Sequence, residues 1–304
     1  MPFRIVPPAL VLVAALSTPA LAQSRTGERL DPAIERRVSG EATVGVLEPY
    51  GSHDRLYGAL GVYASGRLHT WDEGAEARGI VELDGTLRGF FGEVYDDAGS
   101  LRCCAIASST LSLMIGWTDG ASVRVRGGPA ITLPFAMLNS RASSAQYLTQ
   151  LALAATGFWD AWEGFALGPS ALARADVDVR SGVLIAGADL AAGAAFWLWR
   201  DGFWDEPPIA VAHYQIGGYV GIEPIEWLAL GTRVQVAGWS DYGDGHATPS
   251  DADAQVSLVP FARWMGPPWF VEVRGTMNLD EPVGFASRSL MWGVRLAAGV
   301  ELEP

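Results

Sequence analysis

Hydrophobic and polar residues alternate one by one on both sides of a short turn at residues 264–269, WMGPPW. One set of positions is apolar and comprises Val256, Leu258, Ala262, Trp264, Trp269, Val271, Val273 and Met277. The alternate set is polar and includes Ser257, Arg263, Glu272, Arg274 and Asn278. Because successive side chains of a strand point to opposite faces, the pattern predicts an antiparallel hairpin with one apolar and one charged surface.

A tryptophan stands at the same end of each apolar face of this hairpin. Trp264 is the last apolar residue before the turn, and Trp269 is the first one after it. Tryptophan is enriched where the hydrocarbon of a membrane meets water. We therefore interpret the hairpin as part of a transmembrane barrel wall, with Trp264 and Trp269 at the membrane interface. Trp292, on the apolar face of the last predicted strand, is assigned the same role.

The same two-residue period recurs along most of the chain. It predicts strands at 42–46, 56–62, 81–87, 111–117, 121–125, 145–155, 171–179, 183–199, 209–222, 226–239, 252–264, 269–277 and 287–302. The parity of 121–125 continues to residue 137, which indicates either one long strand or two strands divided at Gly127-Gly128-Pro129.

Residues 183–199 also approach the length of a membrane helix, because Asp189 is their only charged residue. Glycines and a carboxylate in the middle of the span weaken a helix, and the neighbouring segments have period two. We therefore expect a strand here.

The connections between the predicted strands alternate in length. Long polar ones at 156–170, 200–208, 240–251 and 279–286 take turns with short ones at 181–182, 223–225 and 265–268. Bacterial outer-membrane barrels combine long external loops with short periplasmic turns and have an even number of strands. The expected fold is all-β, a single transmembrane antiparallel up-and-down barrel over residues 38–302 with about 12 strands, or 14.

The beginning of the chain predicts export. Arg4, an apolar run to Leu16 and the motif Ala20-Leu21-Ala22 are typical of a secretory signal peptide over residues 1–22. Residues 23–37 are polar and without a period, which we interpret as a periplasmic lead-in. The formal net charge of -13 argues against nucleic acid as a partner. The adjacent Cys103 and Cys104 cannot close an unstrained disulfide, so we expect two packed or surface thiols.

These features together resemble the bacterial outer-membrane β-barrel proteins of the porin-like superfamily, over roughly residues 38–302. The resemblance rests on the signal peptide, the amphipathic strands, the tryptophans beside the turn and the asymmetry of the connections. It implies a place in the outer membrane of a Gram-negative bacterium, with outer-membrane lipid as a partner.

The strand parity points a set of charged residues toward the barrel interior. If the lumen is open, these residues line a narrow passive channel for ions or small polar solutes. If it is plugged, the same groups pair with one another, because buried charges need partners, and the role is structural, anchoring or surface-binding. The predicted lumen-lining residues are Arg124, Arg126, Arg174, Asp176, Asp178, Arg180, Asp189, Arg233, Glu272, Arg274 and Arg295.

Catalysis is a minor alternative, in the form of an outer-membrane hydrolase. The four histidines, His53, His69, His213 and His246, are scattered along the chain, and no nucleophile and base are placed together by spacing. The acidic residues between 241 and 253 match no calcium-loop spacing. We expect no enzyme activity, catalytic residue, metal or cofactor.

Overall fold

The computed structural model describes residues 36–48, 55–72, 78–96, 99–106, 109–119, 122–133, 169–196, 210–242, 254–280 and 290–302. These ranges form strands joined in one antiparallel sheet. The strands are β1 (Arg36–Glu48), β2 (Arg55–Asp72), β3 (Arg78–Asp96), β4 (Gly99–Ile106), β5 (Ser109–Thr118), β6 (Val123–Leu133), β7 (Ser170–Ser181), β8 (Leu184–Phe196), β9 (Ala210–Ile225), β10 (Leu228–Tyr242), β11 (Ala254–Gly266), β12 (Trp269–Asn278) and β13 (Leu290–Leu302). Among these described residues, no helix has the length and hydropathy needed to cross a bilayer.

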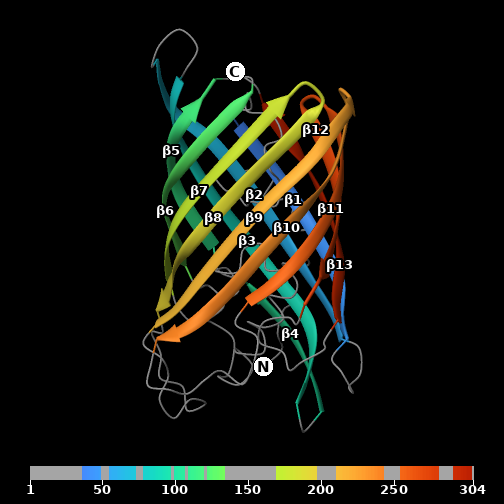
Figure 1. The fold of residues 1–304 in the computed structure, drawn as a ribbon. Helices are drawn as coiled ribbons and strands as arrows, with labels where there is room; N and C mark the ends of the chain where they lie inside the picture. The colour runs from blue at the N-terminus through green and yellow to red at the C-terminus, as the bar shows by residue number, and fades with distance from the viewer. Residues whose placement is uncertain are drawn as a thin grey trace, which may run out of the picture.

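The sheet closes into a barrel, as Figure 1 shows. The first strand pairs with the last, with Val38 opposite Val300 and Val44 opposite Val294. Each further strand pairs with its neighbour around the ring, except that β3 pairs with β5, and β4 pairs with β3 alone. Twelve strands therefore form the wall, which confirms the predicted all-β barrel and its strand number.

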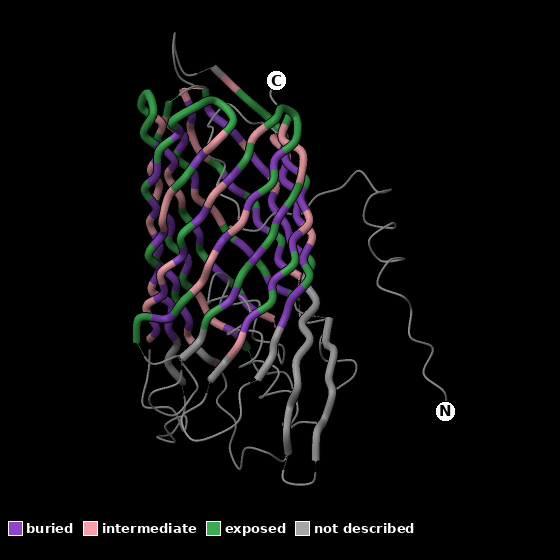
Figure 2. The backbone as a smooth tube through the Cα atoms, turned by 90° about the vertical axis from the view of Figure 1, so that its right-hand side faces the viewer, coloured by how far each residue is buried: buried purple, intermediate pink, exposed green. Residues whose placement is uncertain are grey.

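The two faces of the wall differ in exposure along the strands whose side-chain burial is described. In β7, for example, exposed Ala171, Ala173 and Ala175 alternate with buried Leu172 and Arg174. Figure 2 shows the same alternation of buried and exposed positions around the barrel. Each strand thus has an inner face directed into the barrel and an outer face directed away from it, as the two-residue period predicted.

The short turns that follow β5, β7, β9 and β11 lie at one end of the barrel, which we call the short-turn end. The start of β1 and the end of β13 lie there too, since Arg36 is opposite Leu302. In the turn between β7 and β8, Gly182 has a φ of 59°, a left-handed conformation that favours glycine. Between β5 and β6, the Asp119 side chain accepts hydrogen bonds from the amides of Ser122 and Val123, at 2.6 and 2.8 Å.

The other end of the barrel, the long-connection end, carries the long segments between strands. They separate β6 from β7, β8 from β9, β10 from β11 and β12 from β13. The alternation of short and long connections around the ring follows the order expected from the sequence. The two chain ends of the wall therefore belong to the short-turn end.

Two details of the strand prediction change in the structure, and a third is not tested. Residues 123–133 form one strand, which continues through the two glycines and Pro129. The predicted strand at 145–155 lies outside the described residues. β4 was not predicted, and it extends the sheet beside the far end of β3.

Candidate functional site: the charged interior of the barrel

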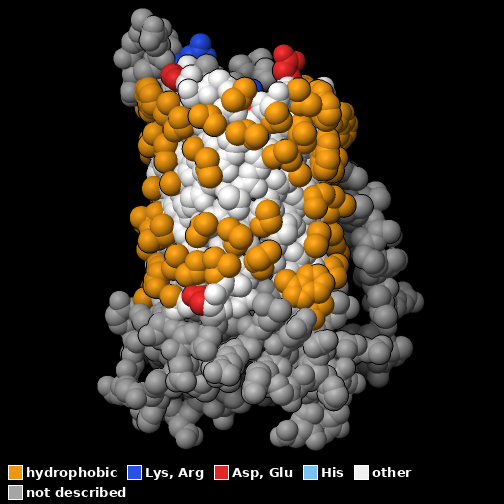
Figure 3. Space-filling view, turned by 45° about the vertical axis from the view of Figure 1, so that its right-hand side comes forward, with side chains coloured by type: hydrophobic (Ala, Val, Ile, Leu, Met, Phe, Trp, Pro, Cys, Tyr) orange, Lys and Arg blue, Asp and Glu red, His pale blue; other side chains and the backbone are white. Residues whose placement is uncertain are grey.

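The outer face of the wall is apolar and carries the three predicted interface tryptophans. Their exposed fractions are 45% for Trp264, 66% for Trp269 and 43% for Trp292. Trp264 and Trp269 lie at the short-turn end, and Trp292 lies toward the opposite end, where it faces Val46 and Met277 on the neighbouring strands. In the view of Figure 3, hydrophobic side chains are distributed over the wall among backbone and uncharged atoms, and charged ones appear only at its ends. This is the distribution of polarity that a bilayer requires of a barrel surface.

Trp227 differs from its predicted orientation. Its parity with Arg233 suggested that it faces inward, whereas it is 54% exposed. It lies in the turn between β9 and β10, and the register shifts between Leu228 and Leu230. An irregularity of this kind interrupts the two-residue period, so parity does not carry across it.

The inner face carries charged side chains from nearly every strand. All of the predicted lumen-lining residues occupy strand positions that alternate with the outer-face positions, and most of them are buried. Within the described residues, arginines and carboxylates occur on this face in nearly equal number. The arginines are Arg37, Arg67, Arg124, Arg126, Arg174, Arg180, Arg233, Arg263, Arg274 and Arg295, and the carboxylates are Glu41, Glu82, Asp84, Asp176, Asp178, Asp189, Glu223, Glu272 and Glu301.

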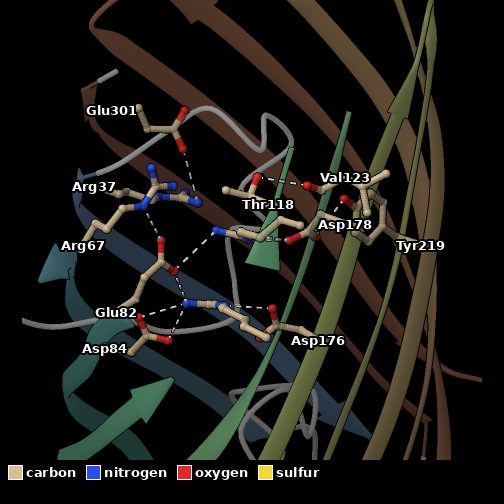
Figure 4. A network of polar contacts seen from close by, with 12 residues as sticks. Arg37, Arg67, Glu82, Asp84, Thr118, Val123, Asp176, Asp178, Tyr219 and Glu301 are labelled. Carbon is tan, nitrogen blue, oxygen red and sulfur yellow. Dashed lines mark hydrogen bonds and ion pairs between the residues drawn. The ribbon is translucent and has the colours of Figure 1, made fainter. Parts of the chain in front are cut away.

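Arg126 is the centre of the largest group of contacts. Its Nη1 donates to Glu82 at 2.8 Å and to Asp84 at 2.9 Å, both on β3. Its Nε donates to Asp176 on β7 at 2.7 Å. Charge-assisted bonds from one planar guanidinium to three carboxylates fix its orientation on the wall. Figure 4 shows these side chains directed toward one another inside the barrel.

Arg124 and Arg67 extend this group along the wall. Arg124 pairs with Asp178, the residue directly opposite it on β7, and its Nη1 lies 3.9 Å from Glu82. Arg67 lies opposite Glu82 and approaches it at 3.4 Å. The Tyr219 hydroxyl donates to Asp178 at 3.1 Å. The result is a continuous network of residues from β2, β3, β6, β7 and β9.

A second group spans the seam between the last strands and β1. Glu301 pairs with Arg263 and lies 3.4 Å from Arg37. The guanidinium carbons of Arg263 and Arg37 lie 4.1 and 4.4 Å from the centre of the Phe270 ring. Cation–π contacts and ion pairs therefore connect β1, β11, β12 and β13 at the short-turn end.

Further pairs complete the ring. They join Glu272 with Arg274, Glu41 with Arg295, Asp189 with Arg233, and Glu223 with Arg180. Each of the contacts described here joins residues on one strand, on adjacent strands, or on strands separated by one other. The charged side chains thus lie along the wall.

Asp176 and Asp178 find their partners on the neighbouring strand, although Arg174 and Arg180 lie two residues away from them on their own strand. Asp176 and Asp178 bind Arg126 and Arg124 on β6, whereas Arg174 donates to Ser112 on β5 and Arg180 pairs with Glu223 at 2.6 Å. Residues directly opposite each other on adjacent strands are closer than residues two apart on one strand. Cross-strand pairing therefore prevails.

The charges are concentrated in the half of the barrel next to the short turns. Along β9, β11 and β12, the inner residues nearest that end include Glu223, Arg263 and Glu272. The inner residues toward the long-connection end are mostly uncharged, and they include Gln215, Gln255, Ser257, Asn278, Thr110 and Thr132. Apolar Leu172, Ala130 and Ala191 also lie on the inner face there, and Arg174 is a charged exception. Within the described strands, the charged side chains of the lumen wall are therefore denser toward the short-turn end.

Several members of the charged set were not among the predicted lumen-lining residues. They are Arg37, Glu41, Arg67, Glu82, Asp84, Glu223, Arg263 and Glu301. Arg37 was placed in the lead-in, although its parity with Glu41 and Thr43 in β1 was the signal that it faces inward. Glu223 was placed in a turn, whereas β9 continues to Ile225.

Within the described ranges, no three residues among His, Cys, Asp and Glu are grouped so as to hold a metal ion. His213 is buried in β9 on the inner face. Cys103 and Cys104 lie in β4, opposite Gly92 and Phe91 of β3.

A closed twelve-stranded antiparallel barrel, apolar outside and charged inside, has the architecture of the porin-like barrels of bacterial outer membranes. No protein family model and no curated protein matches the sequence. An outer membrane channel from Pseudomonas putida F1 is similar in structure, with 11% identity, a TM-score of 0.52, and coverage of 90% of this chain and 98% of its own. That likeness shows a shared fold.

Two other solved structures are less similar. The NanC porin has 10% identity and a TM-score of 0.48, with coverage of 86% of this chain and 100% of its own. The transport unit of the autotransporter AIDA-I from Escherichia coli has 8% identity and a TM-score of 0.48, with coverage of 97% of both chains.

Proposed function

We propose that this barrel is a narrow passive channel of the outer membrane for ions or small polar solutes, and that its charged half is the selective constriction. The observation that carries the proposal is the charged inner face itself. Replacing buried ion pairs by apolar side chains of similar volume is often neutral or stabilising. A wall with a purely mechanical role would therefore gain little from so many arginines and carboxylates.

The near balance of arginines and carboxylates on the described inner face bears on selectivity. Selectivity then depends on which charges lie closest to the path of the solute, rather than on one dominant sign. The uncharged polar side chains toward the long connections, such as Gln215, Gln255 and Asn278, offer hydrogen-bonding groups where fewer charges line the wall. Small polar solutes and ions of either sign are the class of permeant that this lining suits.

The orientation follows from the two ends of the barrel. Short turns face the periplasm in outer-membrane barrels, and long loops face the outside. The connections at 240–251 and 279–286 are then outside the cell, and the charged constriction is on the periplasmic side. In this proposal, outer-membrane lipid contacts the apolar outer face. The proposed activity is transport, and no catalytic activity is proposed.

A plugged barrel is the second candidate, and the burial of the charged side chains favours it. Arg124, Arg233, Arg263 and Arg274 are the largest fully buried side chains among the described residues. Side chains that line an open aqueous pore would contact water. In a plugged barrel these pairs would only hold the wall together.

Planar-bilayer recording of the purified protein separates the two candidates. A channel gives discrete single-channel steps and a reversal potential that shifts under a salt gradient. A folded barrel that inserts into the bilayer without conducting would overturn the channel and leave the structural role. Insertion is checked independently by protection of the wall from protease in the same lipid.

A further inference from the structure

Three consecutive strands each carry a glycine on the inner face at the place where a large side chain of the next strand lies. Gly187 on β8 is opposite Tyr219 on β9, and Gly231 on β10 is opposite Phe261 on β11. Gly217 on β9 is opposite Gln235 on β10, two residues along from Arg233. The three pairs lie side by side along the arc from β8 to β11.

Each of these glycines leaves the space that the large side chain occupies. A Cβ built on Gly187 would overlap the Tyr219 ring, and one on Gly231 would lie 2.5 Å from Cζ of Phe261. These two Cβ atoms would also lie close to backbone, at 2.8 Å from the carbonyl oxygen of Val177 and at 2.7 Å from that of Val220. A Cβ on Gly217 would overlap the Arg233 guanidinium, and its three nearest atoms all belong to that side chain. Any other residue at these positions would force the large side chain to move.

The space lets each side chain lie over the neighbouring strand and reach beyond it. Tyr219 passes over Gly187 to donate to Asp178, the residue on the far side of that glycine. Arg233 passes over Gly217 and binds Asp189 on β8, the residue directly opposite Gly217. Phe261 lies over Gly231 and meets the Tyr219 ring edge-on, with ring centres 6.3 Å apart.

We propose that Gly187, Gly217 and Gly231 determine the width of the permeation path by holding Tyr219, Arg233 and Phe261 flat against the wall. A side chain that lies along the wall takes up little of the lumen, whereas one displaced by a methyl group projects toward the axis. This inference rests on the proposed channel function and adds the residues that control the size of the solute that passes.

The test measures single-channel conductance of Gly217→Ala, Gly187→Ala and Gly231→Ala in the full-length protein. Each variant is expected to conduct less than the wild type. Gly218→Ala is the matched control, because it lies on the outer face of the same strand and its Cβ would meet only a backbone oxygen, at 3.5 Å. Its conductance is expected to equal that of the wild type.

Double variants separate obstruction from damage to the fold. Removing the displaced side chain, in Gly217→Ala with Arg233→Ala and in Gly187→Ala with Tyr219→Ala, is expected to restore conductance. Gly217→Ala is the decisive single variant, since its added methyl group meets only a side chain.

The outcomes distinguish this inference from the proposed function. A wild type that conducts, with glycine variants that conduct equally well, would overturn the role of the glycines and leave the channel intact. A loss of conductance that the double variants do not restore would also overturn it. A wild type that inserts without conducting overturns the channel, and the width-controlling role with it.

Discussion

Arg37, in the first strand of the barrel, and Glu301, in the last, lie 3.4 Å apart on the inner face. Glu301 also pairs with Arg263 two strands away, and both arginines lie over the Phe270 ring. The seam at which the chain closes on itself is thus held by side chains as well as by the backbone pairing of β1 with β13.

The seam group predicts the effect of removing its carboxylate. Glu301→Ala leaves Arg37 and Arg263 close together without that negative charge, and breaking a buried pair in this way costs about 3–5 kcal/mol of stability. Urea unfolding in lipid vesicles, followed by tryptophan fluorescence, measures the loss. Glu226→Ala, in an exposed turn at the same end, is the control and is expected to change stability by less than about 0.5 kcal/mol. Equal effects of the two substitutions would contradict a structural role for the seam group.

Arg126 predicts a second stability difference. Arg126→Ala removes the group shared by Glu82, Asp84 and Asp176, so we expect a loss of about 3–5 kcal/mol. Arg180→Ala removes an arginine whose side chain is 32% exposed and which pairs with Glu223, so about 1 kcal/mol or less is expected. The same unfolding assay compares them. A larger effect at Arg180 would show that the network around Arg126 does not hold the wall.

The apolar outer face predicts that the stability cost of introducing a charged residue there depends on the depth of the residue in the membrane. Val234→Arg places a charge near the middle of β10 on the exposed outer face and is expected to cost about 2–4 kcal/mol in a bilayer. Val38→Arg, close to the short-turn end of β1, is expected to cost about 0–1 kcal/mol. Unfolding in vesicles gives both values. If the two costs are the same, the outer face does not contact hydrocarbon.

The proposed orientation predicts which segments are accessible on intact cells. Epitope tags within 240–251 and 279–286 should bind antibody without permeabilisation, whereas a tag at the turn after Ser181 should bind only after it. The protein itself should fractionate with the outer membrane and resist extraction by urea. The opposite labelling pattern would reverse the orientation, and recovery in the soluble periplasm would remove the membrane assignment.

The inner arginines of β7 predict a change in ion selectivity. Replacing Arg174 and Arg180 by Ser removes two positive charges from a nearly balanced lining, so the reversal potential should shift toward cations. Asp176 and Asp178 keep their partners on β6, and the barrel should remain folded. Arg36→Ser together with Arg78→Ser, at exposed positions, is the control. An unchanged reversal potential in the β7 variant would place these arginines away from the path.

The sequence by itself determined the class of fold. A two-residue period needs only the geometry of a strand, and the alternation of short and long connections needs only the order of the chain. Both could therefore be predicted, and the strand number, the face of each lumen residue in β6, β7, β12 and β13, and the orientation of Trp264, Trp269 and Trp292 followed from them. The signal peptide and residues 23–35 of the lead-in lie outside the described residues and stay predictions, whereas Arg36 and Arg37 of the predicted lead-in belong to β1.

Only the tertiary structure decided which charges meet. Asp176 binds Arg126, 50 residues earlier in the chain, because the register of β6 and β7 places them opposite each other. Parity tells which face of the sheet a residue occupies, but not which residue of the neighbouring strand lies opposite it. A shift of two residues in the register between two strands would keep every side chain on its face and change all of its partners. The same holds for the glycines. From the sequence, Gly217 is only a glycine within a strand, where this residue is usually destabilising. The closed barrel shows that the Arg233 guanidinium lies over it.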